Sequence, residues 1–247
     1  MIQGFFVSTA LSAKYIMNNV PNNFTFRTDR STDLPVPLDD IKKQLGISGY
    51  RDDKRIEDLT WAAIDWLENR YSLVIANSSW EQTVPSLRPE HWRSLTGYLG
   101  FPFGFGWYPH RGNAMQLLSY PVISFDSVGY YDADGNVQDY DLDNFYFMQD
   151  MRYSSYVEVK QGVEIPATQH RPDAWSLFYS CGYGEITSQA GGTVTTALPA
   201  GIVQAIKVVV GEFNENREGS VIGSIVSPVQ MGIDRLIGPY VLDVWGA

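Results

Sequence analysis

The sequence predicts an α+β protein: a small helical bundle with an antiparallel β-domain inserted before its last helix, and extended N- and C-terminal arms. Apolar residues recur at helical spacing early in the chain and again near residue 200. Between these helices lies a long stretch with strand-like alternation and turn signals. Because the early and late helices should pack together, the β-rich stretch is interpreted as an insertion.

Five parts follow from this pattern. They are an N-terminal arm (1–35), the helical part of the core (36–75), the inserted β-domain (76–195), the closing core helix (196–219) and a C-terminal arm (220–247).

Composition and charge restrict the function. The 247 residues are 44% hydrophobic, enough for a sizeable core. The net charge of -10 opposes tight binding of nucleic acid, which needs clustered Lys and Arg, although DNA could still slide past an acidic surface. A single cysteine, Cys181, excludes an internal disulfide. We expect no membrane span, since no run approaches roughly 18 apolar residues, and no signal peptide, since Lys14 follows the first apolar run.

The N-terminal arm is polar and aromatic, with asparagines around Pro21 that indicate a loop. A short helix over residues 5–17 is possible from its apolar content. We interpret the arm as a surface extension.

The first helix is predicted at LDDIKKQL, residues 38–45. Two aspartates lie in its first turn, where they favour the helix dipole, and Gly46 ends it. Its apolar face consists of Leu38, Ile41 and Leu45.

A longer helix follows from Asp53 to about Leu73. Glu57, Asp58 and Glu68 lie off the apolar face of this helix. Trp61 also falls on the polar side, and we favour packing of its side chain within its own subunit over a contact with another subunit. The wide apolar stripe consists of Ile56, Leu59, Ala63, Trp66 and Leu67.

The β-domain begins with the alternating run SSWEQTV. Residues 88–112 are rich in Gly, Pro and aromatics and are interpreted as a long loop. Asp134-Gly135 indicates a hairpin turn, and YSSYVEVKQG and AWSLFYSCGYG indicate further strands. The segment GEITSQAGGTVTTALPAG is interpreted as a flexible linker to the closing helix.

The closing helix begins near Pro199, which suits a first helical turn, and Gly219 ends it. Its apolar face consists of Ile202, Ile206, Val209 and Phe213.

The C-terminal arm is apolar, and disordered tails are usually charged. From Ser220 on, its only charged residues are Asp234, Arg235 and Asp243. Such a segment should bury itself, either on its own domain or in the groove of a partner. The residues alone leave both open.

No pattern indicates catalysis, a cofactor or a metal. A calcium loop from Asp132 would need Gly and Glu where Val137 and Asp143 stand, so a hairpin turn is favoured. His91, His110 and His170 lie too far apart in sequence for a zinc motif. A nucleophilic pair of Cys181 and His170 is conceivable, but a lone cysteine in a strand is usually packing.

Aromatic residues of the long loop could form a sugar-binding platform, or could pack on the sheet or a neighbouring subunit. Packing is favoured. The residues are Trp92, Tyr98, Phe101, Phe103, Phe105, Trp107 and Tyr108.

The order of these segments resembles the phage head–tail connector proteins, or adaptors, of the long type with a β-domain between helices, which is shared with gene transfer agents. The resemblance covers residues 34–219. It rests on LPVPLDDIKKQLGI, RDDKRIEDLTWAAIDWLENRYS, SSWEQTV, YPVISFDSVGYYDADGNVQDYDLDNFYF, RPDAWSLFYSCGYGE and LPAGIVQAIKVVVGEFNENREG.

The resemblance implies a non-enzymatic structural protein of the virion neck, assembled in the host cytoplasm. Such adaptors form a ring, commonly of twelve subunits, between the portal protein and the stopper or tail protein, and DNA passes through the channel without specific binding. The N-terminal arm and the 88–112 loop are longer than in simple members of the family.

For this chain, the resemblance assigns two sets of residues. The C-terminal segment would bind the portal through Ile233, Leu236, Ile237, Tyr240, Val241, Leu242 and Trp245. The subunit core or ring contacts would come from Ile56, Leu59, Trp66, Ile202, Ile206 and Phe213.

Two other functions remain possible on the residues. One is a carbohydrate-binding or receptor-contacting β-module of a virion, which would use Trp92 or Trp107. A less favoured one is a hydrolase dependent on Cys181.

Overall fold

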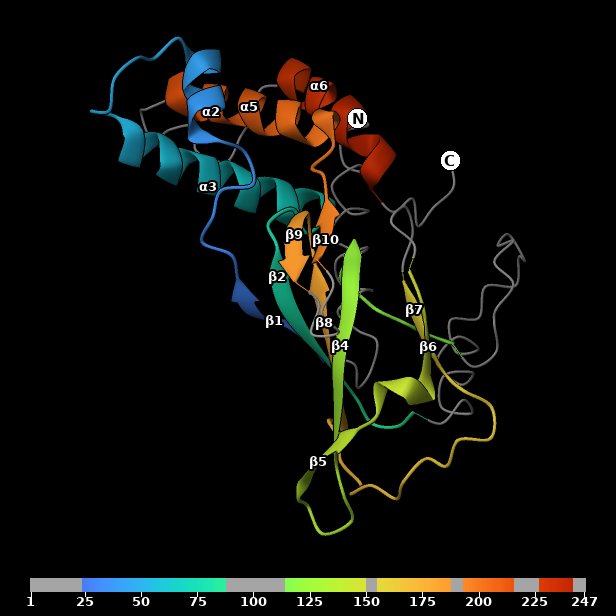
Figure 1. Cartoon of the computed structure of the whole chain (residues 1–247). Helices are drawn as coiled ribbons and strands as arrows, with labels where there is room; N and C mark the ends of the chain where they lie inside the picture. Colours follow the sequence, from blue (N-terminus) through green and yellow to red (C-terminus); the bar gives the residue numbers. More distant parts are fainter. Residues whose placement is uncertain (1–23, 88–113, 150–154, 188–192, 216–226, 242–247) are drawn as a thin grey trace, which may run out of the picture.

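A computed structural model describes residues 24–87, 114–149, 155–187, 193–215 and 227–241. The helices gather at one end of this part of the chain and the strands extend away from them (Figure 1). The prediction of an α+β fold is confirmed.

The bundle contains α2 (Leu38–Leu45), α3 (Asp53–Tyr71), α5 (Ala200–Glu215) and α6 (Ser227–Ile237), followed by the short 3-10 helix η2 (Gly238–Tyr240). Gly46 ends α2 in the left-handed conformation, as its position in the sequence predicted. The described part of α5 ends at Glu215, so the predicted stop at Gly219 lies outside the described residues.

The strands form two larger antiparallel sheets. The five-stranded sheet has the order β1-β2-β8-β4-β5, and the three-stranded sheet has the order β3-β7-β6. The first comprises β1 (Phe24–Arg30), β2 (Ser78–Val84), β8 (Trp175–Cys181), β4 (Val122–Tyr131) and β5 (Val137–Tyr140). The second comprises β3 (Ala114–Gln116), β7 (Tyr156–Val159) and β6 (Phe145–Met148), and the 3-10 helix η1 (Leu142–Asn144) joins β5 to β6.

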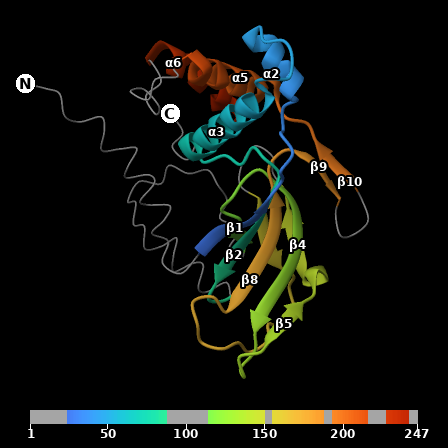
Figure 2. The same ribbon diagram turned by 90° about the vertical axis from the view of Figure 1, so that its left-hand side faces the viewer.

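Three features of the fold differ from the sequence-based expectation. Strand β1 lies inside the region interpreted as an arm, because its ladder partner β2 begins 48 residues after β1 ends and gives no local signal. A hairpin of β9 (Gly184–Thr187) and β10 (Thr193–Thr196) replaces the flexible linker (Figure 2). Helix α6 lies in the C-terminal arm, where Gly and Pro obscured its helical period.

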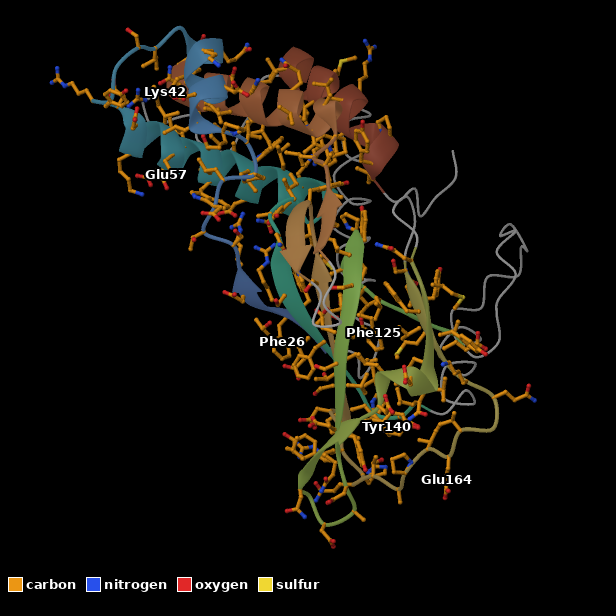
Figure 3. The ribbon with its side chains drawn as sticks, viewed as in Figure 1. Phe26, Lys42, Glu57, Phe125, Tyr140 and Glu164 are labelled. Carbon is orange, nitrogen blue, oxygen red and sulfur yellow. The ribbon has the colours of Figure 1, made fainter. Side chains whose placement is uncertain are left out.

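Two hydrophobic cores result. One lies among the helices. The other lies between the two larger sheets, where Trp175 and Leu177 of β8 join Phe145 and Val157 of the three-stranded sheet. Figure 3 shows Phe125 and Tyr140 on the side of the five-stranded sheet that faces the three-stranded sheet, and the ring of each contacts Phe145. Each part therefore has its own core, and Tyr120 and Tyr183 of the β-domain also pack into the helical one.

Candidate functional site

The helical bundle holds most of the residues that the sequence assigned to function. Ile56 of α3 and Ile202 and Ile206 of α5 are fully buried in the helical core. Leu59, Trp66 and Phe213 are only partly buried against this core. The first three therefore lie in the interior of the bundle, while the last three keep part of their surface exposed.

The C-terminal segment packs on its own subunit through α6. Ile233 and Ile237 are fully buried in the helical core. Leu236, Tyr240 and Val241 are partly buried against it. In this arrangement Ile233 and Ile237 face the interior, so neither presents a surface to a portal. Leu242 and Trp245 lie outside the described residues.

Two close contacts hold α6 in place. The hydroxyl of Tyr71 at the end of α3 donates a hydrogen bond of 2.5 Å to Asp234 Oδ1. Burial, followed by this bond, raises the pKa of Tyr71 far above its ordinary value. At Gly201 of α5, an added Cβ would lie 2.7 Å from the backbone oxygen of Leu236. Glycine is thus required where the two helices cross.

A buried carboxylate joins the bundle to the β-domain. Glu68 of α3 accepts hydrogen bonds from the backbone N–H groups of Ile75 (2.8 Å) and Ala76 (3.0 Å), which lead into β2. Its other oxygen accepts from Arg27 Nη2 of β1 at 2.7 Å. Arg30, also on β1, donates to Asp65. These bonds fix strand β1 and the start of β2 to one helix.

Trp61 packs within its own subunit, as favoured from the sequence. The guanidinium of Arg30 lies 4.5 Å from the centre of its ring, and the indole packs partly buried against the helical core.

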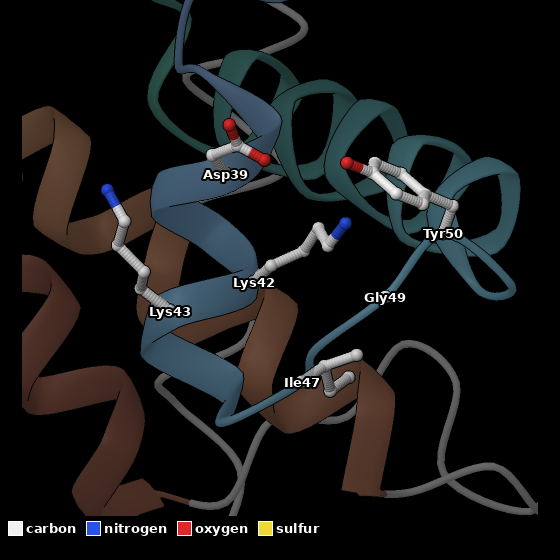
Figure 4. A pocket seen from close by; sticks show the side chains of 6 residues that line it. All are labelled: Asp39, Lys42, Lys43, Ile47, Gly49 and Tyr50. Atoms are coloured by element: carbon white, nitrogen blue, oxygen red, sulfur yellow. The ribbon is translucent and has the colours of Figure 1, made fainter.

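A shallow pocket lies between α2 and the loop that follows it (Figure 4). It encloses about 260 Å³ and is lined by Asp39, Lys42, Lys43, Ile47, Gly49 and Tyr50. The Lys42 ammonium donates to Asp53 at 2.6 Å, and this bond raises the pKa of Lys42 above its ordinary value. The ammonium is thus engaged in holding α2 to α3.

The described residues carry no arrangement suited to nucleophilic catalysis. Cys181 is fully buried in the core between the sheets, and this burial raises the pKa of its thiol well above the ordinary value. Its thiolate, the reactive form, is therefore suppressed. His170 lies on an exposed loop after β7. His91 and His110 lie outside the described residues.

The Asp132 region forms a turn, as favoured from the sequence. Asp132 Oδ1 accepts from the backbone N–H of Asp134 (3.0 Å) and Asn136 (2.9 Å), and Oδ2 accepts from Gln138 Nε2 (2.9 Å). The Gln138 bond is the main cause that lowers the pKa of Asp132. Gly135 has a φ of 86°, which glycine adopts readily. Within the described ranges, no group of three or more His, Cys, Asp or Glu could hold a metal ion.

The aromatic residues proposed as a sugar-binding platform, including Trp92 and Trp107, lie outside the described residues. No helix among the described residues is long and apolar enough to cross a membrane.

The sequence alone missed the polar junction at Glu68 and the packing of α6. A signal for α6 existed in the spacing of Ile233 and Ile237, four residues apart and so on one helical face. Glu68 gave no such signal, because its partner Arg27 lies 41 residues away.

Comparison with known proteins gives matches only among solved structures. No protein-family model matches the sequence, and no curated protein matches it. A chain in the neck of an empty gene transfer agent (GTA) particle, computed with C6 symmetry, matches with a TM-score of 0.57 and 17% identity. The match covers 91% of this chain and 98% of that one.

Two related structures agree. A chain of the virion of a native GTA particle matches with a TM-score of 0.59 and 16% identity over 91% of this chain and 98% of that one. A chain in the neck of a native GTA particle, computed with C12 symmetry, matches with a TM-score of 0.55 and 17% identity, over 86% of this chain and 93% of that one.

The class that the structure defines is therefore an α+β fold with a helical bundle and a β-domain. More particularly, the chain shares this fold over nearly its whole length with chains of GTA particles, two of which lie in the neck. The resemblance to connectors shared with gene transfer agents is thus confirmed at the level of the fold.

Proposed function

We propose that the protein is a structural component of a virion neck: a head–tail adaptor that forms a ring between the portal and the stopper or tail protein. The observation that carries this proposal is the match of 91% of the chain to a chain in a GTA neck. The buried Cys181 also argues against a cysteine hydrolase. We expect the ring to hold twelve subunits. DNA would pass through its channel without specific binding, because the acidic chain does not attract the DNA phosphates.

The burial of these residues supports a division between core and contact positions. We assign Ile56, Ile202 and Ile206 to the subunit core, and the partly buried Leu59, Trp66 and Phe213 to ring contacts. Portal binding is assigned to Leu242 and Trp245, together with the exposed parts of Leu236, Tyr240 and Val241. Ile233 and Ile237 support this segment by holding α6 on the bundle.

Truncation tests the proposal. A chain that ends at Val241 keeps α6 and η2, so it should remain folded, with an unchanged circular dichroism spectrum. We expect it to lose binding to purified portal, whereas the full chain forms a portal-bound ring whose mass is measured by light scattering. Portal binding of equal affinity by both chains would contradict the assignment of the C-terminal segment.

A shorter chain and the behaviour of the full chain complete the test. A chain that ends at Arg217 lacks α6 and should be destabilised, because Ile233 and Ile237 leave the core. If the chain that ends at Arg217 loses portal binding and the chain that ends at Val241 keeps it, the loss is explained by unfolding and not by removal of a portal contact. A full chain that stays monomeric both alone and with portal would overturn the adaptor proposal itself.

A further inference from the structure

Strand β5, residues Val137–Tyr140, is an open edge of the five-stranded sheet. Its inner edge pairs with β4, and no described strand pairs with its outer edge. An edge of this kind presents unpaired backbone N–H and C=O groups, to which an extended segment of another chain can add. In Figure 1, β5 lies at the end of the β-domain farthest from the helices.

This edge is held rigidly from the inside. The Tyr140 ring packs edge-on against Trp175 at 5.2 Å between centroids, and against Phe145 at 5.8 Å. Its hydroxyl donates to the backbone oxygen of Glu164 at 3.0 Å. Gln138 is held by Asp132. The strand is therefore preformed, which lowers the entropy cost of adding a partner strand.

The exposed face of β5 carries one apolar side chain, Val137, with aspartates around it. Val137 is 67% exposed, one of the most exposed large apolar residues of the described chain. Asp139 is exposed two residues later, on the same side of the strand. Exposed Asp134 precedes the strand, and exposed Asp141 and Asp143 follow it.

The negative charge around β5 favours a partner segment that carries positive charge. Residues 132–148 contain five aspartates and no Lys or Arg. The basic groups nearby are engaged, since Arg171 pairs with Asp173 and lies over Tyr131, and Lys160 lies over Tyr146. Two copies of this edge would bring like charges together, which opposes pairing of this chain with itself.

We propose that β5 docks an extended segment of a different neck or tail protein, one that carries Lys or Arg beside an apolar residue. The segment adds to the outer edge of β5, places its apolar side chain against Val137, and places its cations near Asp139 and Asp141. This inference rests on the proposed function, because the partner is another component of the assembled neck.

A photocrosslinking amino acid, p-benzoylphenylalanine, placed at position 137 in assembled particles tests the proposal. We expect a cross-link to one other virion protein, mapped by mass spectrometry to a segment that contains Lys or Arg. The same probe at Tyr50, which is 87% exposed on the bundle, is the control and should not give this product. A cross-link only to a second copy, or none in particles that contain the protein, would overturn the inference.

Reversing the charge of Asp139 provides a second test. Asp139→Lys should lower the yield of the position-137 cross-link by at least tenfold, while the matched Asp134→Lys, which lies in the hairpin turn, should leave most of it. Equal yields in both variants would contradict the role of charge at the edge. Absence of the protein from purified particles would overturn the proposed function and this inference together, whereas incorporation without a cross-link to another protein overturns the inference alone.

Discussion

At the scale of single residues, Glu68 links the helical bundle to the β-domain. It is buried on α3, yet one carboxylate serves Arg27 of β1 and two backbone N–H groups at residues 75 and 76. A buried charge is stable only when such partners surround it. Glu68 therefore helps to hold the β-domain against the bundle, together with the Arg30–Asp65 bond.

Replacing Glu68 by Ala should destabilise the protein by about 3 kcal/mol, because Arg27 would lose its counter-charge and two buried N–H groups would lose their acceptor. Glu68→Gln should cost less, since an amide oxygen can still accept from the backbone. Urea unfolding measures both. Glu57→Ala is the matched control on the same helix, where an exposed pair with Lys54 should change stability by less than about 0.5 kcal/mol. Equal effects at positions 57 and 68 would contradict this role.

At the scale of elements, the crossing of α5 and α6 explains how an apolar C-terminal segment is accommodated. The backbone of Leu236 and the ring of Tyr240 approach Gly201 so closely that a Cβ would lie 2.7 Å from one and 3.0 Å from the other. Ile233 and Ile237 then enter the same core as Ile202 and Ile206. The closing helix thus holds the α6 segment to the bundle.

Gly201→Ala should therefore lower stability by about 2 kcal/mol, because overpacking moves α6 away from α5. The amide protons of α6 should exchange faster in this variant. Gly211→Ala lies on the same helix, where an added Cβ meets nothing within 4 Å. It should raise stability by about 0.5–1 kcal/mol through helix propensity. Unchanged amide-proton exchange in α6 of the Gly201→Ala variant would contradict the close contact between Gly201 and Leu236.

At the scale of the whole molecule, buried tyrosines lie in both cores. Tyr183 joins the helical core and Tyr179 joins the core between the sheets. Burial raises the pKa of Tyr183 to about 12, and burial also raises the pKa of Tyr179 strongly. Both hydroxyls stay protonated in the folded state at a pH where the unfolded chain would ionise.

The contribution of these two tyrosines to stability should therefore be constant below about pH 10, the pKa of an unfolded tyrosine, and should fall as pH rises toward 12. In that window the folded state binds more protons than the unfolded state, so each raised tyrosine lowers stability by up to about 1.4 kcal/mol per pH unit. Urea midpoints at pH 9, 10 and 11 measure this. Tyr183→Phe should reduce the slope, and a midpoint that does not fall between pH 10 and 11 would contradict the prediction.

Local pattern was sufficient for much of the fold. Helix α3, the end of α2 at Gly46 and the turn at Gly135 were predicted because their determinants lie within a few residues of one another. The apolar stripe of α3 was predicted in part, since Leu59 and Trp66 are only partly buried and Ile64 is fully buried. The core positions Ile56, Ile202 and Ile206 were predicted for the same reason, since helical spacing alone places them on one face.

The remaining features depend on contacts between distant segments. Sequence alone determined that an apolar tail must be buried, but only the tertiary structure placed Ile233 and Ile237 against α5. Sequence likewise put Glu68 off the apolar stripe of α3, and the fold buried it by bringing Arg27 to its carboxylate. The physical reason is that helical and strand periods are local properties, whereas the partner that makes burial of a charge or a tail favourable can lie anywhere along the chain.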